Sequence, residues 1–144
     1  MVGSIREATL NDFDEIFKLL EQLWPDKELS REVLMQVFSA ALKAPYNIYL
    51  CTEINGRIAG FCSLVITESL MVDGLAGHIN ELVIDEFFRG TGIGTELLEA
   101  AIAAAKSRGC KRIGLNSAFF RKEAHEFYLN RGLIKSAYFF SKEL

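Results

Sequence analysis

The stretch NELVIDEFFRGTGIGTELLEAAIAAAKSRG, residues 80–109, decides the fold of this chain. It begins with the apolar run LVI at 82–84, which is typical of a buried strand. From Ile93 onward, apolar side chains recur at helical spacing as far as Gly109, a residue that favours a helix end. The glycine-rich segment RGTGIG, residues 89–94, lies between the two. The stretch therefore predicts a strand, a tight turn and a helix, in that order.

The turn has the properties of an anion-binding site. The first four amides of a helix have no partner within the helix, and the helix dipole adds about half a positive charge there. Gly90, Gly92 and Gly94 have no Cβ atoms to keep a ligand away from those amides, and Arg89 adds a cation. We therefore predict that this turn binds a phosphate or a pyrophosphate.

Three phosphate-binding turns compete for this segment. A Walker loop is excluded, because Thr95 and Glu96 stand where it needs lysine and then serine or threonine. A dinucleotide fingerprint matches only in part, because Thr95 occupies the place of its third glycine. The third pattern, Arg-x-x-Gly-x-Gly, is met in full by Arg89, Gly92 and Gly94. A plain tight turn without a ligand remains the alternative.

Composition limits the class of protein. With 144 residues the chain is expected to form one domain, 1–144. It has 16 basic and 19 acidic side chains, a net charge of −3 and no basic run, so we expect no nucleic-acid partner. Three widely spaced cysteines favour a reduced, cytoplasmic location, and no apolar stretch has the length of a membrane span.

The remaining elements follow from local patterns. Asn55-Gly56 is the strongest short hairpin signal, and Pro25 ends the first predicted helix. The predicted order is β-α-α-β-β-β-α-β-α-β. Strands are expected at residues 3–8, 47–53, 57–67, 78–84, 111–116 and 133–142, and helices before Pro25 and at 31–43, 93–109 and 123–130.

At the Arg-x-x-Gly-x-Gly turn the chain resembles the GCN5-related N-acetyltransferases (GNAT). The element order, the segment HEFYLNRGL at 125–133 and the polar Asn116 after a strand match the family as well. The resemblance implies an α/β fold with a mixed, mostly antiparallel central sheet of six to seven strands and about four flanking helices. It also implies acetyl-coenzyme A (acetyl-CoA) as a co-substrate at the turn, with no tightly bound cofactor. The coenzyme-binding residues that it implies are Leu82, Val83, Ile84, Arg89, Gly90, Thr91, Gly92, Ile93, Gly94, Thr95, Asn116 and Tyr128.

Two residues are candidates for catalysis. An ammonium group must lose a proton before it attacks a thioester, and Glu81 is the acid within the buried strand that enters the turn. Burial there would raise its pKa toward a useful range. The family resemblance makes Tyr128 the acid that protonates the leaving thiolate, and assigns the oxyanion to the Val83 amide. The alternatives are that Glu81 points out of the sheet edge or pairs with Arg89, and that the hydroxyl of Tyr128 bonds the backbone.

The resemblance narrows toward small bacterial aminoalkylphosphonate acetyltransferases, through the closing segment from His125 and through Gly-x-Ile-x-Glu-Leu-Val at 77–83. That subfamily is associated with a divalent metal. His78 stands where an acidic residue is expected, so support for a metal is weak and no metal ligand is assigned. Cys62 as an acyl-carrying nucleophile is disfavoured, because the two histidines, His78 and His125, stand in no recognisable arrangement with it.

Two classes of function remain open at this point. In the first, the protein is an N-acetyltransferase that moves an acetyl group directly to a primary amine of a small molecule, with an aminoalkylphosphonate as one candidate. A protein N-terminus or lysine is the alternative acceptor. In the second, the chain is a non-catalytic acyl-CoA sensor. The paired aromatics Phe119, Phe120, Phe139 and Phe140 suggest core positions and a homodimer surface.

Overall fold

The computed structural model describes residues 3–144. The chain falls into two compact units, Met1–Gly114 and Leu115–Leu144. The first unit contains the strand, turn and helix with which the sequence analysis began. The organisation as a single domain stays a prediction.

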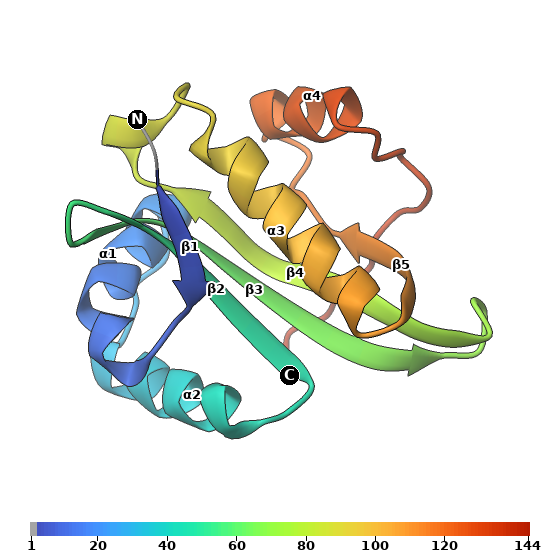
Figure 1. The fold of residues 1–144 in the computed structure, drawn as a ribbon, viewed down its shortest axis with the longest axis horizontal. Coiled ribbons are helices and arrows are strands. Elements are labelled where there is room, and N and C mark those ends of the chain that lie inside the picture. Colours follow the sequence, from blue (N-terminus) through green and yellow to red (C-terminus); the bar gives the residue numbers. More distant parts are fainter. Residues whose placement is uncertain (1–2) are drawn as a thin grey trace. The chain divides into compact units, whose positions relative to one another are not determined.

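The sheet has five strands whose spatial order follows the chain (Figure 1). Each of the first four strands pairs with its neighbour in antiparallel orientation. Asn55 and Gly56 connect the second and third strands, both with positive φ (50° and 77°), as a two-residue hairpin turn requires. The strands are β1 Ser4–Glu7, β2 Asn47–Ile54, β3 Arg57–Ser69, β4 Gly74–Ile84 and β5 Cys110–Leu115.

Helices cover both faces of this sheet in the first unit (Figure 1). The side chains of α1 (Phe13–Leu23), which follows the short helix η1 (Leu10–Asp12), and of α2 (Arg31–Lys43) share one apolar cluster with Cys51, Phe61 and Val83 of the sheet. Helix α3 (Ile93–Ser107) lies on the other face.

Glycines allow α3 to pack closely on the sheet. A Cβ atom at Gly60 would lie 3.2 Å from Leu97, and one at Gly77 would lie 3.4 Å from Ala105. Leu97 and Ala105 both belong to α3. The absence of side chains at Gly60 and Gly77 therefore lets the helix approach the sheet.

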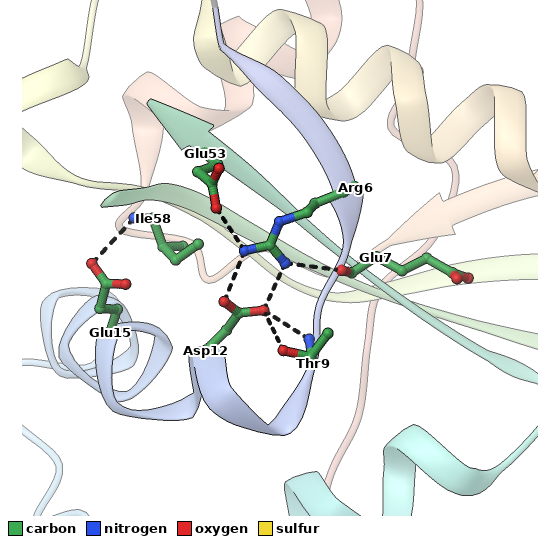
Figure 2. Close-up of polar contacts among 7 residues, drawn as sticks. All are labelled: Arg6, Glu7, Thr9, Asp12, Glu15, Glu53 and Ile58. Carbon is green, nitrogen blue, oxygen red and sulfur yellow. Dashed lines mark hydrogen bonds and ion pairs between the residues drawn. The ribbon is translucent and has the colours of Figure 1, made fainter. Parts of the chain in front are cut away.

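Ionic contacts fix the start of the chain to the sheet (Figure 2). Arg6 of β1 donates to Asp12 at the end of η1 and, at 2.8 Å, to Glu53 of β2. The Thr9 amide donates to the same Asp12 carboxylate at 2.7 Å, which completes a capping box. The N-terminal strand, the first helix and β2 are therefore joined by one polar cluster.

The predicted fold class is confirmed, but the prediction of a last strand is wrong. The second unit contains α4 (Lys122–Asn130), and the segment expected as a strand at 133–142 has no regular secondary structure. The sheet has five strands rather than six to seven. An apolar strand-like pattern expresses a tendency to be buried, whereas a strand also needs a paired backbone, which the local sequence does not specify.

Candidate active site

Strand β4 holds Glu81 against Ser63 of β3. The two residues are direct partners in the antiparallel register. Ser63 Oγ donates to Glu81 Oε1 at 2.5 Å, and the Glu81 amide donates to the same Oγ at 2.9 Å. The carboxylate is thus fixed in direction by a neighbouring strand.

Burial changes the acid–base chemistry of this position. Desolvation raises the pKa of Glu81, and the hydrogen bond from Ser63 opposes that rise because it favours the charged form. Burial also raises the pKa of Tyr49 on β2 and, to about 12, that of Cys62, with a further increase from the charge of Glu81 in each case. A carboxylate with a raised pKa is a stronger base than an exposed one.

The backbone of β4 after Glu81 points alternately to its two sides. The Asp85 amide donates across to β3 at 2.8 Å, and the Ile84 carbonyl instead accepts from Arg89 Nε at 3.1 Å. Because successive strand residues direct their backbone groups to opposite sides, the Val83 amide faces β3, whereas those of Leu82 and Ile84 face away from β3. This alternation favours Leu82 and Ile84 over Val83 as amide donors to a ligand.

The glycine turn has an open backbone surface. Gly90 and Gly92 have φ of +78° and +90°, and a Cβ atom at either would meet nothing within 4 Å. Thr91 Oγ1 donates to the Phe88 carbonyl at 2.5 Å, which stabilises the turn from within. The geometry therefore fits a ligand that approaches the backbone closely, as a pyrophosphate does.

Helix α3 begins at this turn, as predicted. Its N-cap is Gly92, and its first turn contains Ile93, Gly94 and Thr95. Ile93 is buried, so the helix start is held by the core. The amide-bearing first turn and the exposed Arg89 guanidinium are consistent with the anion site that the sequence predicts.

Two predicted site residues belong to the second unit. Asn116, which follows β5, is exposed. Tyr128 lies on α4 with its ring 5.5 Å from that of Phe127, edge to face. The first unit thus contains both Glu81 and the turn, whereas Asn116 and Tyr128 lie in the second unit.

The structure was searched for metal-binding clusters and for membrane-spanning helices. Across residues 3–144, no group of three or more histidine, cysteine, aspartate or glutamate side chains could hold a metal ion. None of the helices in that part of the chain has the length and apolar character to cross a membrane.

Sequence patterns alone did not identify Ser63 as a site residue. The available signal was a lone hydroxyl residue in the apolar run GFCSLVI, residues 60–66. Ser63 is fully buried, and a buried hydroxyl usually has a partner. The partner itself was not readable, because the pairing of β3 with β4 shifts by one residue between Ser63 and Leu64.

Comparison with known proteins gives consistent matches. The family model described as the acetyltransferase (GNAT) family matches residues 10–133. An aminoalkylphosphonate N-acetyltransferase from Salmonella typhimurium is 33% identical over 143 residues, 99% of this chain and 92% of that protein. Glucosamine 6-phosphate N-acetyltransferase 1 from Oryza sativa is 28% identical over 136 residues, 91% of this chain and 81% of that protein. The crystal structure of glucosamine-6-phosphate N-acetyltransferase from Arabidopsis thaliana superposes with a TM-score of 0.84 at 26% identity, covering 99% of each chain.

Proposed function

This chain belongs to the acetyltransferase (GNAT) family, and we propose that it moves the acetyl group of acetyl-CoA directly to a primary amine of a small molecule. That it is an acetyl-CoA-dependent N-acetyltransferase follows from the family and from relatives that carry this activity in their names. The half-buried Glu81 carboxylate, held by Ser63, carries the proposal that the amine is activated on this chain.

Glu81 is the proposed general base. An alkylammonium ion loses a proton to the carboxylate, directly or through one water, and its nitrogen lone pair then attacks the thioester carbonyl. A C–N bond forms as the C–S bond breaks, and the nitrogen then gives up a second proton as the neutral amide forms. The departing thiolate takes up one proton, so the net products are the acetamide, the free coenzyme thiol and the one proton that Glu81 returns to solvent. The raised pKa of Glu81 supports this role, because it brings the carboxylate closer to neutral pH.

Residues of the first unit are proposed to bind the coenzyme. The amides at the start of α3 and the cation of Arg89 would hold the pyrophosphate. The amides of Leu82 and Ile84, which face away from β3, would bond the pantetheine arm and the developing oxyanion. Gly90 and Gly92 leave room for that ligand.

Two residues of the second unit are proposed to act on the coenzyme. Tyr128 would donate the proton that the departing coenzyme thiolate takes up, and Asn116 would bond the pantetheine arm. These roles rest on the family resemblance of HEFYLNRGL and of the residue that follows β5.

The acceptor is proposed to be an aminoalkylphosphonate. The Salmonella typhimurium relative is an aminoalkylphosphonate N-acetyltransferase, and the Oryza sativa relative acts on glucosamine 6-phosphate. Both named compounds combine an amine with a phosphorus oxyanion. A protein N-terminus or lysine is the alternative acceptor, and a non-catalytic sensor is the alternative class. A sensor has no use for a partly desolvated base of raised pKa, so the half-buried Glu81 favours the enzyme.

Location and assembly stay predictions. The three cysteines, Cys51, Cys62 and Cys110, are free thiols, which is consistent with the proposed cytoplasmic location. A homodimer is proposed from the aromatic pairs noted in the sequence.

Two measurements on one preparation test the proposal. Calorimetric titration of acetyl-CoA should give a dissociation constant near ~1 μM, about −8 kcal/mol. Release of free thiol should then follow addition of aminoalkylphosphonates, with the matched alkylamines that lack phosphorus as controls. Binding without thiol release from any small amine would favour the sensor or a protein acceptor. No binding would remove the ligand role of the turn.

A further inference from the structure

We infer that Ser63 is a positioning residue for catalysis, because its hydroxyl fixes one oxygen of the Glu81 carboxylate and leaves the other to take the proton of the amine. The inference rests on the proposed function of Glu81 as the base. It adds a residue on β3, whose sequence pattern indicated only a buried strand.

The two hydrogen bonds of Ser63 have different consequences. Its one hydroxyl proton is donated to Glu81 Oε1 at 2.5 Å, so this oxygen is occupied when the carboxylate is charged. The same oxygen atom of Ser63 accepts from the Glu81 amide at 2.9 Å. Backbone and side chain of Glu81 are therefore held by a single atom, which restricts the rotation of the carboxylate.

The contact lies beside an irregularity in the strand pairing. Ser63 pairs with Glu81, but the next residue, Leu64, pairs with Ile79, so Asn80 is an extra residue on β4. A bulge of this kind interrupts the regular backbone ladder and redirects a side chain. Beside this interruption, Ser63 Oγ accepts from the Glu81 amide.

Burial makes the contact selective. Ser63 is fully buried, so water does not compete strongly for its hydroxyl. The titratable groups that sense the charge of Glu81 are Tyr49 on β2 and Cys62 on β3. Both have raised pKa values and stay neutral near pH 7, so the hydroxyl dipole of Ser63 is the contact that favours the charged carboxylate.

The test compares variants at this one position. Ser63→Ala removes the hydroxyl, and Ser63→Thr restores it on a larger side chain. Ile66→Val, a buried change on the same strand away from Glu81, controls for loss of packing. The readouts are the pH dependence of kcat/KM, acetyl-CoA affinity, and the carboxyl ¹³C chemical shift of Glu81 against pH, assigned with Glu81→Gln.

The expected result is a displaced pH profile. In Ser63→Ala, the acidic limb of the pH profile of kcat/KM and the titration of the Glu81 carboxyl both move to higher pH. At pH values on the acidic side of that limb, kcat/KM falls about tenfold relative to wild type. Coenzyme affinity stays unchanged, Ser63→Thr recovers most of the activity, and Ile66→Val leaves the limb in place.

Two different failures are distinguishable. If Glu81→Gln keeps full activity, the base itself is misassigned and the proposed function loses its central step. If Glu81→Gln is inactive while Ser63→Ala keeps the wild-type titration of Glu81, the base stands and the role of Ser63 is refuted. Should Ser63→Ala fail to fold, Ser63→Cys takes its place, because a thiol is a weaker donor and must move the titration of Glu81 to higher pH; an unchanged titration would refute the role.

Discussion

Arg6 and Asp12 meet at two points. Arg6 Nη1 donates to Asp12 Oδ2 at 2.8 Å, and Nη2 donates to Oδ1 at 2.9 Å (Figure 2). The hydrogen bond from Arg6 is the main reason that the pKa of Asp12 falls to about 2, while burial acts in the opposite direction. A carboxylate of lowered pKa stabilises the folded state above its unfolded pKa, and this contribution is lost as the pH falls through the folded value.

We predict that Asp12→Asn lowers the free energy of unfolding by about 2 kcal/mol at pH 7. The difference from wild type should shrink between about pH 4 and pH 2, where the wild-type carboxylate takes up its proton. Urea unfolding at pH 7 and pH 3 measures both values. Asp14→Asn, which removes an exposed ion pair with Arg31, is the control and should cost under about 1 kcal/mol. An equal loss for Asp12→Asn at the two pH values would attribute the effect to packing.

Gly92→Val should weaken acetyl-CoA binding by at least about 100-fold, roughly 3 kcal/mol. The side chain would occupy the open space at the turn, and a φ of +90° is unfavourable for valine. Gly109, at the other end of α3, has a similar φ of +85° and equally open surroundings. Gly109→Val therefore reproduces the backbone strain of Gly92→Val without changing the turn. Calorimetry on both variants separates the two effects. Similar affinity in the two would count against a coenzyme site at the turn.

Glu81→Gln should lower the rate by about 100-fold at pH 7. The deficit should narrow as the pH approaches the pKa of the amine, because the free amine then needs no base. The same variant should be more stable than wild type above the raised pKa of Glu81, since a partly desolvated charge is removed. Rate profiles and thermal unfolding between pH 6 and 9 test both parts. A profile identical to wild type would move the base to water or another acid.

Tyr128→Phe should lower kcat about 100-fold and change coenzyme affinity by less than about twofold, because only the departing thiolate needs its proton. Tyr138→Phe makes the same chemical change at an exposed tyrosine and should leave kcat unaltered. Steady-state kinetics with calorimetry provides the measurement. Full activity in Tyr128→Phe would remove the proposed acid.

Local signals predicted most of the first unit. Asn55-Gly56 specified a two-residue turn because both of its residues need positive φ, and the strands on either side end within two residues of their expected limits. The start of α3 at Ile93 followed from the glycines and the apolar spacing. The positions at which these strands and α3 begin or end could therefore be predicted from the local sequence alone.

Pairing between distant segments was not readable. The strand expected at 133–142 has the right composition, but the structure gives it no regular pairing. The contact of Ser63 with Glu81 depends on a bulge in β4, and a shift of one residue would have placed a different side chain opposite the carboxylate. The acceptor pocket shares this difficulty, since the sequence shows no motif for it.

The strand order has a kinetic consequence. β2 and β3 are joined by two residues and β3 and β4 by four, whereas β1 and β2 must close a loop of residues 8–46 before they can pair. Loop closure costs more entropy as the loop lengthens, so the two hairpins should form early and β1 should add last. In pulse-labelled hydrogen exchange, amides of β2 and β3 should gain protection before those of β1. The polar cluster around Arg6 would then form late in folding and would not belong to the folding nucleus.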